Sequence, residues 1–139
     1  MRSVVKMKGI KPEEFYDLLI ASAMADIKNH TRKSPKQLNS GFSYLRQNKK
    51  KKETVVITKA EKNREYEITV KREKLDIVMN YQIEEIENGI IVTLQQTTRP
   101  DYRITIFQVL FANISARNML KDMEVEILRL RKKKAKEKE

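Results

Sequence analysis

The chain has 139 residues, of which 40% are hydrophobic and 35% charged, with three glycines, three prolines and no cysteine. A domain of this length buries roughly 70% of the surface that its unfolded chain exposes, so it can form a substantial core. The lack of cysteine excludes disulfides and thiolate metal sites. No apolar stretch resembles a signal peptide or approaches the roughly 20 residues of a membrane span, so we expect a cytoplasmic protein without a transmembrane segment.

The formal net charge of +11 comes mostly from two segments. One is the run of four residues Lys49, Lys50, Lys51 and Lys52, and the other is the basic end of the chain, residues 129–139. Both could contact phosphates, and the basic end could instead rest on an anionic lipid surface. Equally, adjacent lysines form a solvated loop tip, and cations near a helix C-terminus complement its dipole. We therefore treat the four lysines as a weak anion-binding candidate.

The first elements expected are a short strand over residues 3–7 and a helix over residues 12–29. Gly9 ends the strand, and Pro12 suits a first helical position because that N–H has no partner inside the helix. Apolar residues then recur at spacings of three and four, which is typical of a helix with one buried face. Ser34 followed by Pro35 predicts a second helix of about one turn, ending near Leu38.

From Gly41 the hydrophobic period changes to two, which predicts five strands near residues 42–46, 55–60, 66–70, 75–83 and 90–94. Asn88 and Gly89 form a strong hairpin signal between the last two. Parallel neighbours need crossovers of a dozen residues or more, so connections this short predict an antiparallel meander. Its apolar face requires a cover.

A helical period returns at about Tyr102 and predicts a closing helix of roughly thirty residues, about 45 Å long. The apolar stripe breaks near Arg117, which indicates either a bend or a change of packing partner. Residues 101–105 are alternatively one more strand of the sheet. The closing helix is the natural cover for the meander.

This order of elements predicts an α+β helix-grip fold: a strand, a helix with a short second one, five strands and a long last helix, with six or seven strands curved around that helix. On this order the chain resembles the START-like superfamily, which includes polyketide cyclases and ligand-binding proteins. The segments PEEF (12–15), GFSY (41–44), NYQIE (80–84) and MLKDME (119–124) resemble an uncharacterised bacterial family of single-domain proteins within it. The superfamily resemblance implies a cavity between sheet and last helix that takes up lipids or other hydrophobic molecules.

Strand alternation predicts which residues would line such a cavity. Tyrosine hydroxyls would orient a ligand and a flexible methionine would adapt to its shape. The alternative is that the same residues are simply the core, because a covered sheet needs an apolar face whether or not it binds anything. The candidate residues are Tyr44, Tyr66, Ile68, Met79, Tyr81, Val92 and Leu94 from the sheet, and Phe107, Phe111 and Ile114 from the last helix.

No constellation of residues indicates catalysis, a metal or a cofactor. The single histidine, His30, falls at the end of the first helix, where a capping or surface role is the ordinary one. We expect a solvated strand end at Glu84, Glu85 and Glu87, because they precede the hairpin turn. Asp76 has apolar neighbours, but alternation places it on the outer face of its strand. We therefore expect a protein that is not an enzyme.

The sequence predicts one domain over residues 1–131 followed by a basic tail over residues 132–139. Its leading function is binding of a hydrophobic small molecule or lipid between the sheet and the last helix. The alternative is a basic module with a filled core that binds nucleic acid or protein. Self-association through edge strands or through the last helix is a third reading.

Overall fold

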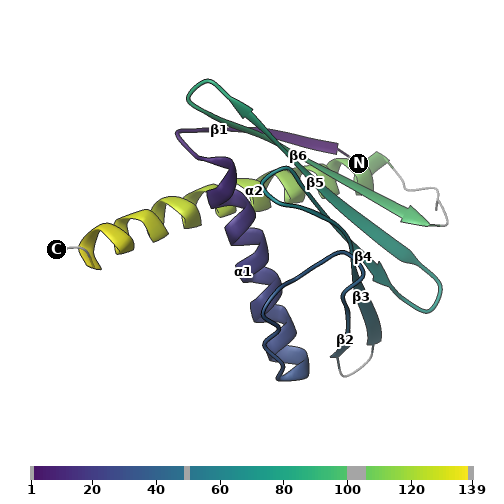
Figure 1. The fold of residues 1–139 in the computed structure, drawn as a ribbon. Helices are drawn as coiled ribbons and strands as arrows, with labels where there is room; N and C mark the ends of the chain where they lie inside the picture. Colours follow the sequence, from purple (N-terminus) through teal and green to yellow (C-terminus); the bar gives the residue numbers. More distant parts are fainter. Residues whose placement is uncertain (1, 49–50, 100–105, 138–139) are drawn as a thin grey trace.

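The computed structural model describes residues 2–48, 51–99 and 106–137, and side chains for residues 2–47, 52–99 and 116–137. Within these residues the chain forms six strands and two helices (Figure 1). In chain order they are β1 (Arg2–Lys8), α1 (Pro12–Thr31), β2 (Ser43–Asn48), β3 (Lys51–Glu61), β4 (Glu65–Lys71), β5 (Asp76–Ile86), β6 (Gly89–Arg99) and α2 (Ile106–Glu137). The strands make one antiparallel sheet in the order β1-β6-β5-β4-β3-β2.

Turn residues with left-handed backbone geometry set the hairpins. Asn63 and Asn88 have φ near 64°, at the β3–β4 and β5–β6 turns, and asparagine tolerates this region better than most residues. Gly89 follows Asn88 and lies so close to β1 that a Cβ on it would stand 2.4 Å from the carbonyl oxygen of Met7. Only glycine fits there, so this turn both closes the β5–β6 hairpin and seats β1 beside β6.

One face of the sheet is covered by both helices and holds the core. Aligned residues on this face are Val5, Val92 and Ile83 across β1, β6 and β5, followed towards the opposite edge by Tyr81 and Tyr66. The helices contribute Phe15, Tyr16, Leu19, Ile27, Leu120 and Ile127 to the same cluster. The sheet therefore has an inner, covered face and an outer face of mostly hydrophilic side chains, as the alternation predicts.

Helix α1 starts with a reciprocal contact at its N-terminus. The backbone N–H of Lys11 donates to the Glu14 carboxylate at 3.0 Å, and Pro12 takes the first helical position. At the other end Arg32 adopts φ 60° and its N–H donates to the carbonyl of Lys28, which closes the helix. The helix runs two residues beyond the predicted end at residue 29.

Helix α2 crosses the sheet and continues past it, so that its C-terminal end stands away from the strands (Figure 1). Leu120 and Ile127 are buried, whereas Val125 is 64% exposed. The Arg131 guanidinium donates to the Glu14 carboxylate and to the carbonyl oxygen of Gly9, which ties α2 to the start of α1. The helix continues without interruption through residue 131 to Glu137.

The α+β helix-grip architecture is confirmed, with six strands in the part of the chain that the structure describes. The short helix predicted between Ser34 and Leu38 is wrong: this segment is irregular and joins α1 to β2, with Leu38 buried against the core. One turn gains too few hydrogen bonds to offset its nucleation. Residues 101–105, which were the candidate extra strand, lie outside the described residues.

Candidate ligand-binding site

The register of the sheet arranges the inner face as rows that run across the strands. One row joins Leu94, Tyr81 and Tyr66, and the next joins Met79, Ile68 and Ile57. A third row joins Ile77, Val70, Val55 and Tyr44. Beyond it, at the end of the sheet that carries the β2–β3 and β4–β5 connections, Arg46 pairs with Glu53. We call this end the rim.

The predicted lining residues fall into two groups: some are buried in the core, and others are only partly buried. Tyr66, Tyr81, Val92 and Leu94 are between 0% and 7% exposed and belong to the packed core. Helix α1 fills this part of the inner face, since the ring of Phe15 lies 6.4 Å from that of Tyr81 and Tyr16 lies edge-on to Tyr66 at 6.3 Å. The sequence did not indicate that α1 shares the inner face with α2.

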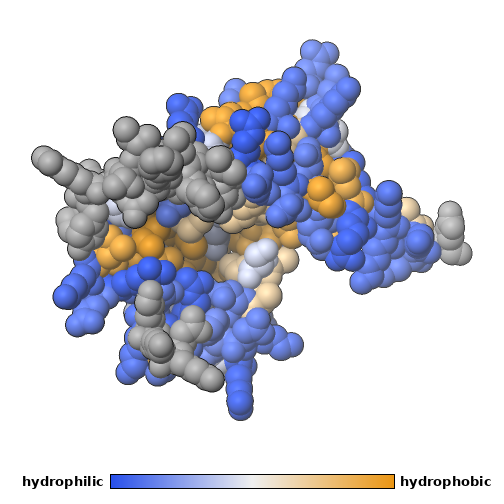
Figure 2. Space-filling view, turned by 180° about the vertical axis from the view of Figure 1, so that it is seen from behind, coloured by the Kyte–Doolittle hydropathy of each residue, from blue (hydrophilic) through white to orange (hydrophobic). Residues whose placement is uncertain are grey.

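Part of the inner face is less covered than the core rows, although Val55 and Val70 near the rim are themselves buried. Ile68, Met79, Phe42 and Tyr44 are only partly buried although they pack against the core cluster. From behind, Figure 2 shows apolar surface in a hollow, with hydrophilic side chains along part of its border. We call the partly buried inner face formed by these four residues the recess. The side chains of Phe107, Phe111 and Ile114 lie outside the described residues.

Three tyrosines on the inner face are held in their neutral form. Burial raises the pKa of Tyr81 to about 12 and raises that of Tyr66 well above its usual value. Burial, followed by the hydrogen bond to Asp26, raises the pKa of Tyr44 in the same direction. Each hydroxyl therefore keeps its proton into more alkaline solution than an exposed tyrosine would. Of the three, Tyr44 is the one that faces the recess.

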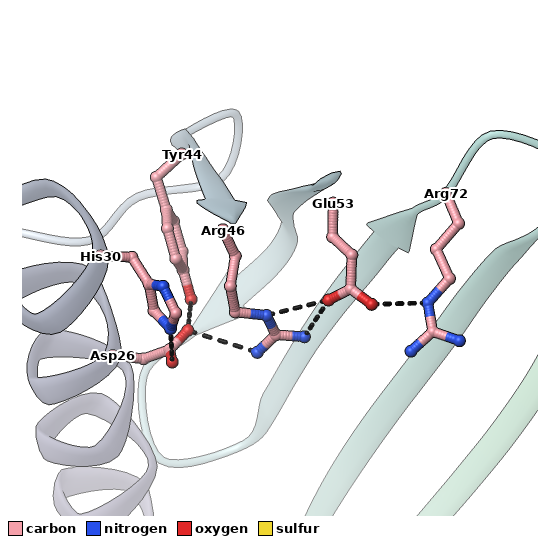
Figure 3. A network of polar contacts seen from close by, with 6 residues as sticks. All are labelled: Asp26, His30, Tyr44, Arg46, Glu53 and Arg72. Atoms are coloured by element: carbon pink, nitrogen blue, oxygen red, sulfur yellow. Dashed lines mark hydrogen bonds and ion pairs between the residues drawn. The ribbon is translucent and has the colours of Figure 1, made fainter. Parts of the chain in front are cut away.

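A network of polar side chains closes the rim and joins α1 to the sheet (Figure 3). The Tyr44 hydroxyl donates to Asp26 Oδ2, and Arg46 Nη1 lies 3.4 Å from the same oxygen. The imidazole of His30 lies 3.5 Å from the other oxygen of Asp26. We call this set the rim network. Its members are Asp26, His30, Tyr44, Arg46, Glu53 and Arg72.

Glu53 is the centre of the rim network. Arg46 donates to its Oε2 from Nε at 3.0 Å and from Nη2 at 2.9 Å, while Arg72 Nε donates to Oε1 at 2.6 Å. The Glu53 side chain is 11% exposed. Burial raises its pKa, but the hydrogen bonds and charges of Arg46 and then Arg72 outweigh burial and hold the pKa below its usual value. The carboxylate is ionised and shared by two guanidinium groups.

The sequence held a partial signal for this network. Arg46 alternates in phase with Tyr44, and a hairpin centred on the lysine run pairs Arg46 with Glu53. The links to Asp26 and Arg72 depend on the packing of α1 and on the β4–β5 connection, which no short motif encodes. His30 belongs to the network in addition to standing in the last turn of α1.

The predicted anion-binding residues fall largely outside the described part of the chain. Lys49 and Lys50 are not described, and neither is the side chain of Lys51. Lys52 is exposed at the start of β3. Asp76 occupies the outer-face phase of β5, opposite Lys71 and Arg99.

Two further searches of the described residues concern metals and membranes. No group of three or more histidine, aspartate or glutamate side chains among them has a geometry that could hold a metal ion. Neither helix, over its described length, is apolar enough to cross a bilayer. A separate groove of about 230 Å³ lies between α1 and α2, with Leu18 and Ile127 among its lining and Arg131 at its edge. This volume is below the range usual for small-molecule sites.

Comparisons with known proteins give a family and a fold. A family model described as "Domain of unknown function (DUF3284)" matches residues 3–114. No curated protein matches the chain. Among solved structures, the Aha1 dimer from Colwellia psychrerythraea is similar at TM-score 0.60 and 15% identity, over 89% of this chain and 92% of that one.

Two other solved structures are similar over nearly their whole length. Ara h 8.0201 has TM-score 0.59 and 12% identity, and the match covers 93% of this chain and 97% of that one. Protein MLL2253 from Mesorhizobium loti has TM-score 0.56 and 18% identity, over 92% and 93% of the two chains. At such identities the likeness concerns the fold alone, which is the START-like helix-grip fold.

Proposed function

The chain belongs to the family described as a domain of unknown function, DUF3284, and from this premise and its helix-grip fold we propose that it binds a hydrophobic small molecule in the recess. The proposal is of a binding protein without catalytic activity. The observation that carries it is the uneven cover of the inner face. Core residues next to α1 are fully buried, whereas Ile68 and Met79, which pair across β4 and β5, stay partly exposed.

A partly exposed apolar surface on a concave face is unfavourable in water, at roughly 25 cal/mol for each Å² that remains uncovered. A ligand with an apolar body removes that surface from water without disturbing the core. Met79 is unbranched and flexible, so it can adapt to ligands of different shape. The Tyr44 hydroxyl, whose proton is donated to Asp26, adds an acceptor oxygen at one side.

The test is binding of a neutral, apolar fluorescent probe, anilinonaphthalene, together with native mass spectrometry of the purified protein. We expect a saturable rise in fluorescence and a co-purified apolar molecule of defined mass. Met79→Trp places a larger side chain in the recess and should abolish probe binding while circular dichroism stays unchanged.

Thr97→Trp is the matched control, because Thr97 is exposed on the outer face of the neighbouring strand β6. It adds the same indole to the same sheet and should leave probe binding unchanged. If the wild type shows no saturable binding, or if both variants bind like the wild type, the recess is not a ligand site.

The projecting end of α2 favours a second candidate function. The C-terminal end of α2, which stands away from the sheet (Figure 1), carries four exposed lysines: Lys132, Lys133, Lys134 and Lys136. Such a surface suits the phosphates of a nucleic acid. If this second function holds, log K should fall steeply with log salt, by about 0.9 for each phosphate neutralised on duplex DNA. Electrophoretic retardation at several salt concentrations tests it, and retardation that is absent at low salt rejects it.

A further inference from the structure

The side chains of the rim network differ in how many of their donor and acceptor atoms have a partner. Both oxygens of Asp26 have partners, and so do both oxygens of Glu53. All three nitrogens of the Arg46 guanidinium are engaged as well. Acceptors in this network are therefore already satisfied by the donors around them.

Arg72 is different. Its Nε donates to Glu53, while its two terminal nitrogens point away from the network and have no partner among the described residues (Figure 3). The side chain is 37% exposed. The backbone N–H of Arg72 donates to the carbonyl of Leu75 at 2.8 Å, which fixes this arginine at the β4–β5 connection. Within the described part of the chain, it thus presents two charged donors without a partner at the rim.

We infer that the ligand of the recess is amphipathic and anionic, and that its carboxylate or phosphate group binds the two terminal nitrogens of Arg72. This inference rests on the proposed function and names the chemical class of the ligand. A planar guanidinium is suited to two parallel hydrogen bonds with either kind of anion. Two exposed lysines at the same end of the sheet, Lys52 and Lys71, add to the attraction.

The spacing of the rows sets the size of such a ligand. Residues on one face of a strand are about 6.7 Å apart, so the rim row lies about 13 Å from the row of Ile68 and Met79. The row between them contains the partly buried Ile77 and Tyr44 at its two ends and the buried Val70 and Val55 in its middle. An apolar chain of about this length would place its body on the recess and its anionic end beside Arg72.

The experiment measures displacement of the neutral probe by three compounds with the same dodecyl chain: dodecanoate, dodecyl phosphate and dodecanol. We expect both anions to compete about tenfold more strongly than the alcohol, which is the range of one charge-assisted contact. The two anions together tell a carboxylate site from a phosphate site. Inorganic phosphate alone should not displace the probe, because it lacks the apolar body.

Two variants change the site in opposite directions. Arg72→Gln should remove most of the preference for the anions and leave the affinity for dodecanol within about twofold. Glu53→Gln withdraws the carboxylate that competes for Arg72, so it should strengthen the anion preference. Lys74→Gln is the control: it removes one positive charge at the same end of the sheet from an exposed side chain outside the rim network.

The outcomes separate this inference from the proposed function. If the neutral probe binds but the three compounds compete equally, or if Lys74→Gln lowers the anion preference as much as Arg72→Gln does, the assignment to Arg72 is overturned and the recess remains a ligand site. If the neutral probe does not bind at all, the proposed function itself fails. An anion preference that Arg72→Gln removes, Glu53→Gln increases and Lys74→Gln preserves supports the inference.

Discussion

Replacing Glu53 by glutamine tests whether the rim network stabilises the fold as its geometry indicates. The substitution keeps the size of the side chain but removes the charge shared by Arg46 and Arg72. The new amide also directs an N–H₂ donor at groups that are themselves donors. Both guanidinium groups then lose their anionic partner at the edge of the core.

The structure sets the expected magnitude. Glu53 accepts three hydrogen bonds from charged donors, at 3.0, 2.9 and 2.6 Å. The two arginine side chains are 30% and 37% exposed, so water partly replaces what they lose. We therefore expect a loss of about 2 kcal/mol, below the sum for three fully buried charge-assisted bonds. For a chain of 139 residues this lowers Tm by about 7 °C.

The pH dependence follows from the lowered pKa of Glu53. A carboxylate with a folded-state pKa below its usual value of 4.5 stabilises the fold fully above that value, and the contribution is lost as the pH falls through the folded-state pKa. Urea unfolding of the wild type and of Glu53→Gln should thus differ by the full amount at pH 7. The difference should shrink below about pH 4.5, as protonation makes the two proteins alike.

Glu61→Gln is the control, because Glu61 is exposed on the same strand and should change stability by less than about 0.5 kcal/mol. A Glu53→Gln variant as stable as the control at pH 7 would contradict the role assigned to the network. So would a loss of stability that is equally large in acid.

Three other perturbations have defined outcomes. Gly89→Ala should destabilise the fold by about 2 kcal/mol or more in urea unfolding, since its Cβ would stand 2.4 Å from the backbone oxygen of Met7 and β1 would have to move; near-wild-type stability would contradict this close approach. Because burial raises the pKa of Tyr81 to about 12, its folded form keeps a proton that the unfolded chain loses, so stability should fall between about pH 10 and 12, and less so in Tyr81→Phe. Arg131→Gln should cost no more than about 1 kcal/mol, since the ion pair with Glu14 is partly exposed, but should speed amide hydrogen exchange in the last turns of α2; unchanged exchange there would show that the contact does not hold the helix end.

The fold was predictable because each element carries its own period. Alternation over β4 and β5 identified their inner residues, and the Asn88-Gly89 signal located the hairpin between β5 and β6. Predicted boundaries fell short mainly at strand ends, where hydrophilic residues continue the pairing beyond the alternating core, as on β6 to Arg99. Local pattern cannot detect pairing that only the neighbouring strand enforces.

The site was predictable only in part, for a related reason. Alternation places Tyr66 and Met79 on one face but does not say what covers each of them. Tyr66 is sealed by Tyr16 of α1, whereas Met79, one row away, stays partly exposed. What covers each of them is a property of the whole fold and not of any one strand.

The cost of removing charged groups from water explains why the polar residues lie at the rim and not among the core rows. A charged row between two apolar rows would have to be desolvated on both sides, whereas at the end of the sheet Arg46 and Arg72 keep about a third of their surface in water. Glu53, the more buried of the three, is compensated by both. The inner face thus runs from a dry row at Leu94 and Tyr81 to a charged edge, and an asymmetric ligand bound there could lie in only one direction.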